Sequence, residues 1–180
     1  MYEKLTKAKF VNTGMANAVF FAPTSYFEED GIKGPTTGSA STLENMTVIS
    51  DDHVFKTGKG FIKLNCAPFK NELNASGIGE VGSMSLDQTI NVNVLGNYAE
   101  LHASMSLLLN EPCIVILGGV DCVDEPRTQL GTECVPTYVS SMEFTSGTLK
   151  DGQKGYAVSF NSVAGAIFSY EGDVIEKPEP

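Results

Sequence analysis

Residues 83–95 alternate between polar and apolar side chains, and no other feature of the sequence constrains the fold as strongly. Successive side chains of a β-strand point to opposite sides, so a period of two places the two sets on opposite faces. One face would carry Met84, Leu86, Gln88, Ile90, Val92 and Val94, and the other Ser83, Ser85, Asp87, Thr89, Asn91 and Asn93. The segment predicts a long strand with one face against a core and a polar face directed away from it.

The glycine-rich stretch GIGEVG, residues 77–82, precedes this strand and has the spacing of a dinucleotide-binding fingerprint. The fingerprint needs a buried strand before the glycines and a helix after them, because the pyrophosphate binds at the helix N-terminus. Here residues 71–79 have the composition of a turn, and a strand pattern follows. Residues 56–60 (KTGKG) also lack the upstream Gly and the following Ser or Thr of a phosphate-binding loop. We therefore predict a bend or bulge at the glycines, and no cofactor.

One helix is predicted over residues 97–110. Asn97 can cap its N-terminus, and Glu100 stands three residues further on, as in a capping box. The spacing of its apolar residues gives a stripe that would face a core. This stripe consists of Leu101, Met105 and Leu108.

Further strands are predicted at residues 9–23, 59–67, 113–117, 138–148, 155–163 and 166–170. About seven or eight strands with one helix predict a mainly β (α+β) fold, an antiparallel β-sandwich or barrel with one flanking helix. We expect a single domain over residues 1–180. Residues 28–50, rich in Gly, Ser and Thr, are expected to form an extended loop, residues 118–136 another loop, and residues 176–180 a flexible tail.

The formal net charge of −10 and the pI of about 4.6 argue against a protein that grips duplex DNA through a basic face. The charge is unevenly distributed, because residues 71–149 hold ten acids and a single base, Arg127. Lysines gather elsewhere, at positions 4, 7, 9, 56, 59, 63 and 70. Such patches could attract copies of the chain to one another, or could be solvated faces that keep it soluble.

The four cysteines form no C-x-x-C pair, so their spacing gives little indication of a zinc or redox site. Cys66 and Cys113 stand in apolar runs and are expected to be buried. A disulfide between Cys122 and Cys134 is neither indicated nor excluded by the sequence. The N-terminal sequence has no apolar signal core and no run is long enough to span a membrane. These features predict a soluble protein of a reducing cytoplasm.

The two histidines are the candidate general bases. His102 is expected on the helix surface, and His53, after two aspartates, in a polar turn. The acids at 121, 124 and 125 lack the ligand spacing and the Gly of a calcium loop. We find no catalytic or metal-binding constellation, and predict that the chain is not an enzyme.

The order of a strand with a polar face, a helix and a buried strand resembles that of phage tail tube (major tail) proteins. The residues that carry it are GEVGSMSLDQTINVNVLGN, YAELHASMSLLLN and EPCIVIL, followed by SSMEFTSGTLKDGQKGYAVSF. The similarity extends over residues 59–174, and tubes of contractile injection and type VI secretion systems are similar too. It implies a small β-barrel or sandwich with a helix at its side.

The resemblance also implies a role: a virion tail protein, made in the host bacterial cytoplasm, that forms hexameric rings stacked into a tube. Other tail proteins would be partners, and DNA would pass through without specific binding. The polar face of residues 83–93 would line the lumen. Subunit contacts would come from the 28–50 loop and its lysine-bearing flank. These expected contact residues are Gly34, Thr36, Ser41, Glu44, Lys56 and Lys59.

Other functions compatible with this sequence are a capsid decoration protein, a head–tail connector protein and a carbohydrate-binding β-sandwich. The last is disfavoured because sugars usually stack on aromatic rings and the chain has no Trp.

Overall fold

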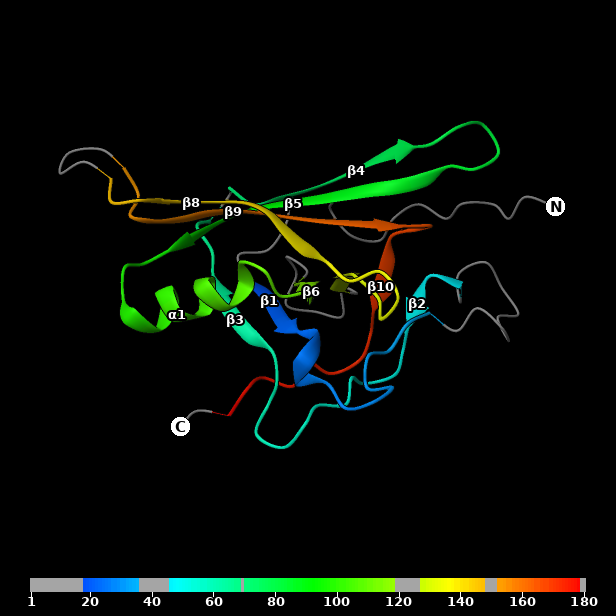
Figure 1. Cartoon of the computed structure of the whole chain (residues 1–180), viewed down its shortest axis with the longest axis horizontal. Helices are drawn as coiled ribbons and strands as arrows, with labels where there is room; N and C mark the ends of the chain where they lie inside the picture. Colours follow the sequence, from blue (N-terminus) through cyan, green and yellow to red (C-terminus); the bar gives the residue numbers. More distant parts are fainter. Residues whose placement is uncertain (1–17, 36–45, 69, 119–126, 148–151, 179–180) are drawn as a thin grey trace.

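The computed structural model describes residues 18–35, 46–68, 70–118, 127–147 and 152–178 (Figure 1). These residues form two β-sheets, one α-helix and a short 3-10 helix, Thr24–Tyr26. The predicted mainly β, α+β fold is confirmed. In this part of the chain the sheets stay open, so the fold is a sandwich and not a closed barrel.

The two sheets are the layers of the sandwich, and the four-stranded sheet runs along the top of Figure 1. Its order is β4 (Glu72–Ile78), β5 (Ser85–Leu95), β9 (Gly155–Ala164), β8 (Tyr138–Thr145). The six-stranded sheet has the order β2 (Val48–Ile49), β10 (Phe168–Tyr170), β7 (Arg127–Leu130), β6 (Cys113–Leu117), β1 (Ala18–Pro23), β3 (Ile62–Asn65). All neighbouring strands are antiparallel except β10 and β2.

The six-stranded sheet is covered on both faces, which explains the continuous apolar run of β6. One face packs against the four-stranded sheet and the helix α1 (Ala99–Leu108) in a core that includes Val115, Ile90 and Val92. The opposite face carries a second core around Phe61 and Tyr170. A strand with both faces buried gains stability from apolar side chains at every position, and all five β6 residues are buried.

The alternation predicted for residues 83–95 is confirmed in β5. Its Gln88, Ile90, Val92 and Val94 are buried, whereas the residues between them are only partly covered. The strand begins at Ser85 and not at residue 83. Met84 lies in the hairpin that links β4 and β5 and is 61% exposed, so it belongs to neither face of the strand.

Three short or exposed strands were not predicted. β4 was expected to be a turn, because its residues are almost all exposed and give no apolar period. β7 lies in the expected 118–136 loop, and β2 in the expected 28–50 loop. β2 and β7 have too few residues for a pattern, and all three strands form because a neighbouring strand supplies hydrogen-bond partners for the backbone. The flexible tail predicted at 176–180 begins with two residues that are bound to the fold. Glu176 forms a β-bridge with Phe61, and the Lys177 N–H donates to the Phe61 carbonyl oxygen.

The predicted helix is present, and its buried residues are those of the predicted stripe. The predicted capping box is wrong. The N-cap residue is Tyr98, no side chain caps the helix, and Asn97 Oδ1 lies 2.8 Å from His102 Nε2. The amide oxygen therefore binds a ring one turn into the helix and is not used as a cap.

Two adjacent leucines test how α1 closes the core. Leu108 is fully buried, and Leu109 is 52% exposed. Leu108→Ala should lower the free energy of unfolding by about 2–5 kcal/mol, because it removes buried methyl groups and leaves a cavity. Leu109→Ala, the matched control, should change it by less than about 0.5 kcal/mol. Urea unfolding followed by circular dichroism measures both, and equal effects would contradict this packing.

Candidate functional site

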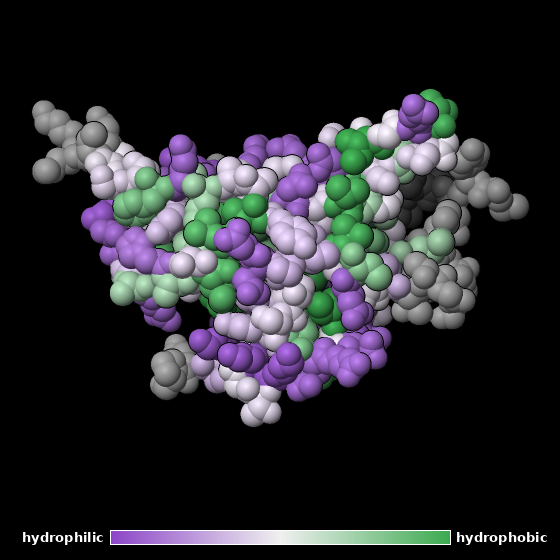
Figure 2. Space-filling model, viewed as in Figure 1, coloured by the Kyte–Doolittle hydropathy of each residue, from purple (hydrophilic) through white to green (hydrophobic). Residues whose placement is uncertain are grey.

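The candidate site is the outer face of the four-stranded sheet, the face turned away from the six-stranded sheet. Ladder pairing sets its composition, because residues opposite one another share a face. Thr89 of β5 stands opposite Asn74 of β4 and Asn161 of β9, and Tyr138 of β8 stands opposite Asn161. Hydrophilic and neutral side chains cover much of the top of the molecule over this sheet in Figure 2, and hydrophobic side chains reach the top toward the β4–β5 hairpin.

Asn91, near the centre of this face, connects three strands through its amide group. Its Nδ2 donates to Glu72 Oε1 of β4 at 3.0 Å, and its Oδ1 accepts from Ser159 Oγ of β9 at 2.7 Å. Ser140 of β8 extends the chain of contacts by donating its hydroxyl to the Ser159 carbonyl oxygen. Side-chain hydrogen bonds therefore connect the polar groups at the centre of this face across strands.

Asn161 of β9 forms a second cross-strand connection on the same face. Its Nδ2 donates to Asp87 Oδ1 at 2.6 Å and to Thr89 Oγ1 at 3.3 Å. Asn93 completes the pattern at the far end of β5 by donating to the carbonyl oxygen of Lys70. Carboxylate oxygens that accept such bonds have less capacity left for an outside donor.

The face is acidic. The four strands contain Glu72, Asp87 and Glu143 but no lysine, arginine or histidine. In the described part of the chain, Lys70 lies near the strand ends, where its Nζ donates to Gln153 Oε1 at 3.0 Å. A surface of this composition offers phosphate groups no cationic partner.

The sheet has two edge strands, β4 and β8, each with a strand neighbour on one side only among the described residues. An edge presents unpaired backbone N–H and C=O groups to which another strand can add. The β4–β5 hairpin projects beyond the body of the sandwich (Figure 1), with Val81 fully exposed at its tip and Met84 nearby. The sheet could therefore be extended by other chains.

The residues predicted to line a lumen lie together. Ser85, Asp87, Thr89, Asn91 and Asn93 share the outer face, and Ser83 is exposed in the hairpin just before it.

The residues predicted for subunit contacts are only partly described. Lys56 and Lys59 are exposed and flank the 3-10 helix: Lys56 Nζ donates to the Ser25 carbonyl oxygen, and Lys59 Nζ lies 4.6 Å from the centre of the Tyr26 ring. Gly34 is exposed as well. Thr36, Ser41 and Glu44 lie outside the described residues.

His53 lies away from this face, and its predicted place in a polar turn is wrong. The aspartates before it indicated a polar turn, yet the side chain is 1% exposed, between aromatic rings. Desolvation by burial lowers its pKa from the ordinary value of 6.5. A histidine in a polar sequence gives no signal of burial, because the aromatic residues around it come from distant segments.

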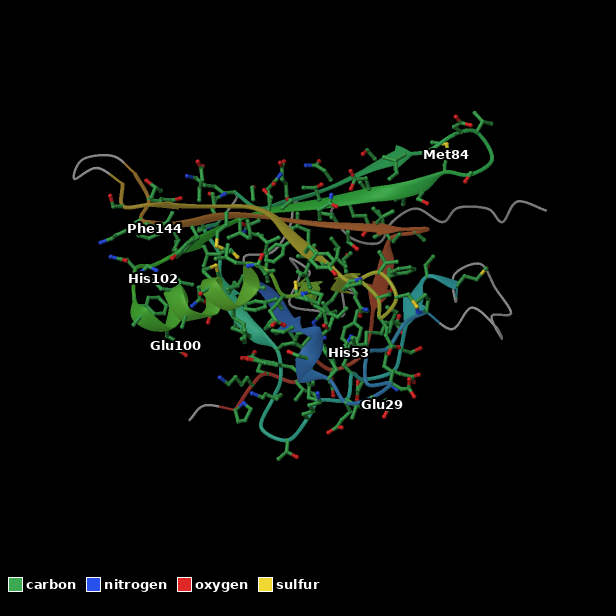
Figure 3. The ribbon with its side chains drawn as sticks, in the orientation of Figure 1. Glu29, His53, Met84, Glu100, His102 and Phe144 are labelled. Carbon is green, nitrogen blue, oxygen red and sulfur yellow. The ribbon has the colours of Figure 1, made fainter. Side chains whose placement is uncertain are left out.

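His102 is half-buried on α1. Its Nδ1 lies 2.6 Å from the Tyr156 hydroxyl oxygen, and its ring contacts Phe144 edge-on (Figure 3). Both of its nitrogens are thus engaged. No group of three potential metal ligands gathers among the residues that the structure describes.

A pocket of about 290 Å³ opens between the two sheets, where the ends of β5 and β9 meet the segment after β7. Ser162 Oγ is buried in its wall without a hydrogen-bond partner among the described residues, and Phe168 forms part of the wall. None of its lining residues is titratable, so the pocket fits a small, mainly apolar group and offers no acid or base.

Comparisons of the chain with protein-family models, curated proteins and solved structures find no match. None of the helices in the described ranges is long and apolar enough to cross a membrane.

The thiols provide a test of the burial described above. Burial raises the pKa of Cys66 to about 11 and of Cys113 to about 12, whereas Cys134 is exposed with a free thiol. The thiolate is the reactive form, so a maleimide should modify Cys134 in the folded chain and the two buried cysteines only after unfolding. Peptide mass spectrometry measures this. Equally fast labelling of Cys66 in the folded chain would contradict its burial. Cys122 lies outside the described residues.

Proposed function

We propose that this chain is a structural subunit of the phage tail tube type. It assembles into stacked rings, with hexamers expected from the resemblance, and the outer face of the four-stranded sheet lines a channel for DNA. The observation that carries the proposal is this face: mainly polar, acidic, cross-linked by side-chain hydrogen bonds at Asn91 and Asn161, and free of lysine and arginine along its four strands. The apolar Ile78 and Val163 lie on it toward the β4–β5 hairpin end. The chain would then act in the virion tail after assembly in the bacterial cytoplasm.

A conduit for DNA should not bind what passes through it. Binding to phosphates takes much of its free energy from counterions that Lys and Arg release, so a wall without these residues lacks that affinity. The carboxylates of Glu72 and Asp87 would repel phosphates, since charges of the same sign at close range raise the free energy. Amide groups that already hydrogen-bond within the sheet have few donors left for DNA.

The edge strands support assembly. In a ring, each sheet could continue into the next through β4 of one copy and β8 of its neighbour, which would satisfy the backbone groups at both edges. A closed ring leaves no such edge, so the assembly stops growing sideways and extends only by stacking. Exposed Val81 and Met84 at the hairpin tip would be covered by a neighbouring copy.

Assembly and its geometry are the direct test. The purified chain should elute from a size-exclusion column as a large species and form tubes with an axial hole in negative-stain electron microscopy. A stable monomer at high concentration would contradict the proposal. Single rings that do not stack would contradict it too, and would favour a connector.

A gold label tests which face lines the channel. Thr89→Cys on the outer face and Lys177→Cys in the C-terminal segment would each be made with Cys122→Ser and Cys134→Ser, then coupled to a gold-cluster maleimide. Lys177 is exposed and hydrogen-bonds through its backbone to Phe61, whose ring is in the second core, away from the four-stranded sheet. Gold at Thr89→Cys should lie along the tube axis, and gold at Lys177→Cys outside it. The reverse pattern would contradict the lumen assignment.

Charge reversal tests the lysine-bearing flank, which we propose to contact an acidic surface of the next ring. Lys56→Glu combined with Lys59→Glu should reduce the fraction of chain in tubes at moderate salt, because attraction becomes repulsion. Each single variant is compared with Lys154→Glu, a reversal in the β8–β9 hairpin with the same change in charge. Sedimentation and negative-stain microscopy measure the fraction. Equal assembly by all variants would remove this contact from the proposal.

A further inference from the structure

We propose that His53 and Gln129 form an acid-sensitive clamp on Lys33, which holds the chain just after the Asp30 turn against the six-stranded sheet at neutral pH and releases it in acid. His53 precedes β3 in the chain, Gln129 lies in β7, and Lys33 follows the turn at Asp30. Distant parts of the chain thus meet at one buried imidazole, labelled in Figure 3 on the side of the six-stranded sheet opposite the polar face.

The clamp grips both backbone groups of Lys33. Its N–H donates to His53 Nδ1 at 3.0 Å, and its carbonyl oxygen accepts from Gln129 Nε2 at 3.2 Å. The two gripping side chains are joined by a contact of 2.9 Å between His53 Nε2 and Gln129 Oε1. The three residues therefore close a ring of hydrogen bonds.

This ring fixes the protonation state of the imidazole. Gln129 Nε2 faces two carbonyl oxygens, those of Lys33 and Gly131, so the amide oxygen must be the atom that faces His53. His53 Nε2 then carries the proton and donates it to Oε1. Nδ1 must be unprotonated, because it accepts a hydrogen bond from the Lys33 N–H.

An added proton would break the clamp. On Nδ1 it would place two N–H groups face to face, and the imidazolium would be buried among aromatic rings. His53 stacks on Tyr170 with the ring centres 5.0 Å apart and has Phe27 and Phe61 edge-on at 5.5 and 5.7 Å. A buried cation without a carboxylate in direct contact is costly.

The surrounding charges do not offset this cost. Desolvation is the largest cause of the lowered pKa of His53. The hydrogen bonds to the Gln129 side chain and the Gly31 backbone raise this pKa, the Lys33 ammonium lowers it and the Asp52 carboxylate raises it, and the net direction is downward. Burial raises the pKa of Tyr170 to about 12, so its hydroxyl stays protonated. Among the described residues, Asp30, Arg127 and Asp173 are further charged groups near the cluster. The backbone carbonyl oxygen of Asp30 accepts from Lys33 Nζ, Arg127 donates to the carbonyl oxygen of Gly172, and the backbone oxygen of Asp173 accepts from the Tyr170 hydroxyl.

The direction of the pH effect follows from linkage. The pKa of His53 is lower in the folded chain than in an open one, so the open form binds more protons below pH 6.5. The clamp is fully closed above that pH and loses stability as the pH falls below it. Residues 28–31 have other backbone bonds, to Val54, whereas the backbone of Lys33 is held by the clamp.

If the 28–50 segment contacts neighbouring subunits, acid would also weaken the tube, and this consequence rests on the proposed function. The clamp itself belongs to the single chain. It is therefore tested on the unassembled fraction of the full chain, where a failure to form tubes has no bearing on the result.

Hydrogen exchange of the Lys33 amide, measured by mass spectrometry on the peptide that contains it, tests the clamp. From about pH 8 to about pH 5, with intrinsic exchange rates divided out, protection should be constant above pH 6.5 and fall by up to tenfold per pH unit below it. In His53→Phe, which cannot titrate, the amide should be less protected and independent of pH. In His102→Gln, the matched control, the pH dependence should persist.

Imidazole nitrogen NMR on the natural chain keeps the test independent of whether His53→Phe folds. The chain has two histidines, so His102→Gln assigns both. His53 should be the tautomer with its proton on Nε2 and should titrate below 6.5. A proton on Nδ1, a titration at or above 6.5, or Lys33 protection that ignores pH would overturn the proposal.

Discussion

The inward face of β5 is the contact on which the rest of the structure depends. Ile90, Val92 and Val94 are almost completely buried against the six-stranded sheet and α1. Because a strand has a period of two, burying these residues forces Thr89, Asn91 and Asn93 to the other side. A slip of one residue would bury the amides and expose the valines, so apolar burial fixes both the register of the sheet and the chemistry of its outer face.

The outer face then acquires a property that its composition alone does not give. Asn91 and Asn161 bond across strands to Glu72, Asp87 and Ser159, so the polar groups at the centre of the face are partly satisfied by one another. Together with the absence of lysine and arginine from the four strands, this makes a wall that solvates well and attracts phosphate poorly. The tube proposal depends on that combination, and the open edges of the same sheet supply a way for copies to join.

Prediction from sequence succeeded for elements whose apolar residues pack against a core. The long strand and the apolar stripe of α1 had enough residues to show a period, β6 was marked by a continuous apolar run, and each was confirmed. It failed for β4 and β7, whose backbones pair with strands that already exist, and for Asn97, whose amide binds His102. The contacts of a single side chain and the pairing of an exposed edge strand depend on residues that are distant in the sequence, so no local pattern predicts them.

The sequence by itself determined the fold class, the acidic balance and the polar face of residues 85–93, since these follow from side-chain type and order along one segment. Only the tertiary structure decided which distant segments of the chain contact one another. The burial of His53 needs Phe27, Phe61 and Tyr170, which are spread over most of the chain, and its protonation state is set by Gln129 and Lys33. Desolvation and hydrogen-bond geometry arise between segments, and a local pattern cannot encode them.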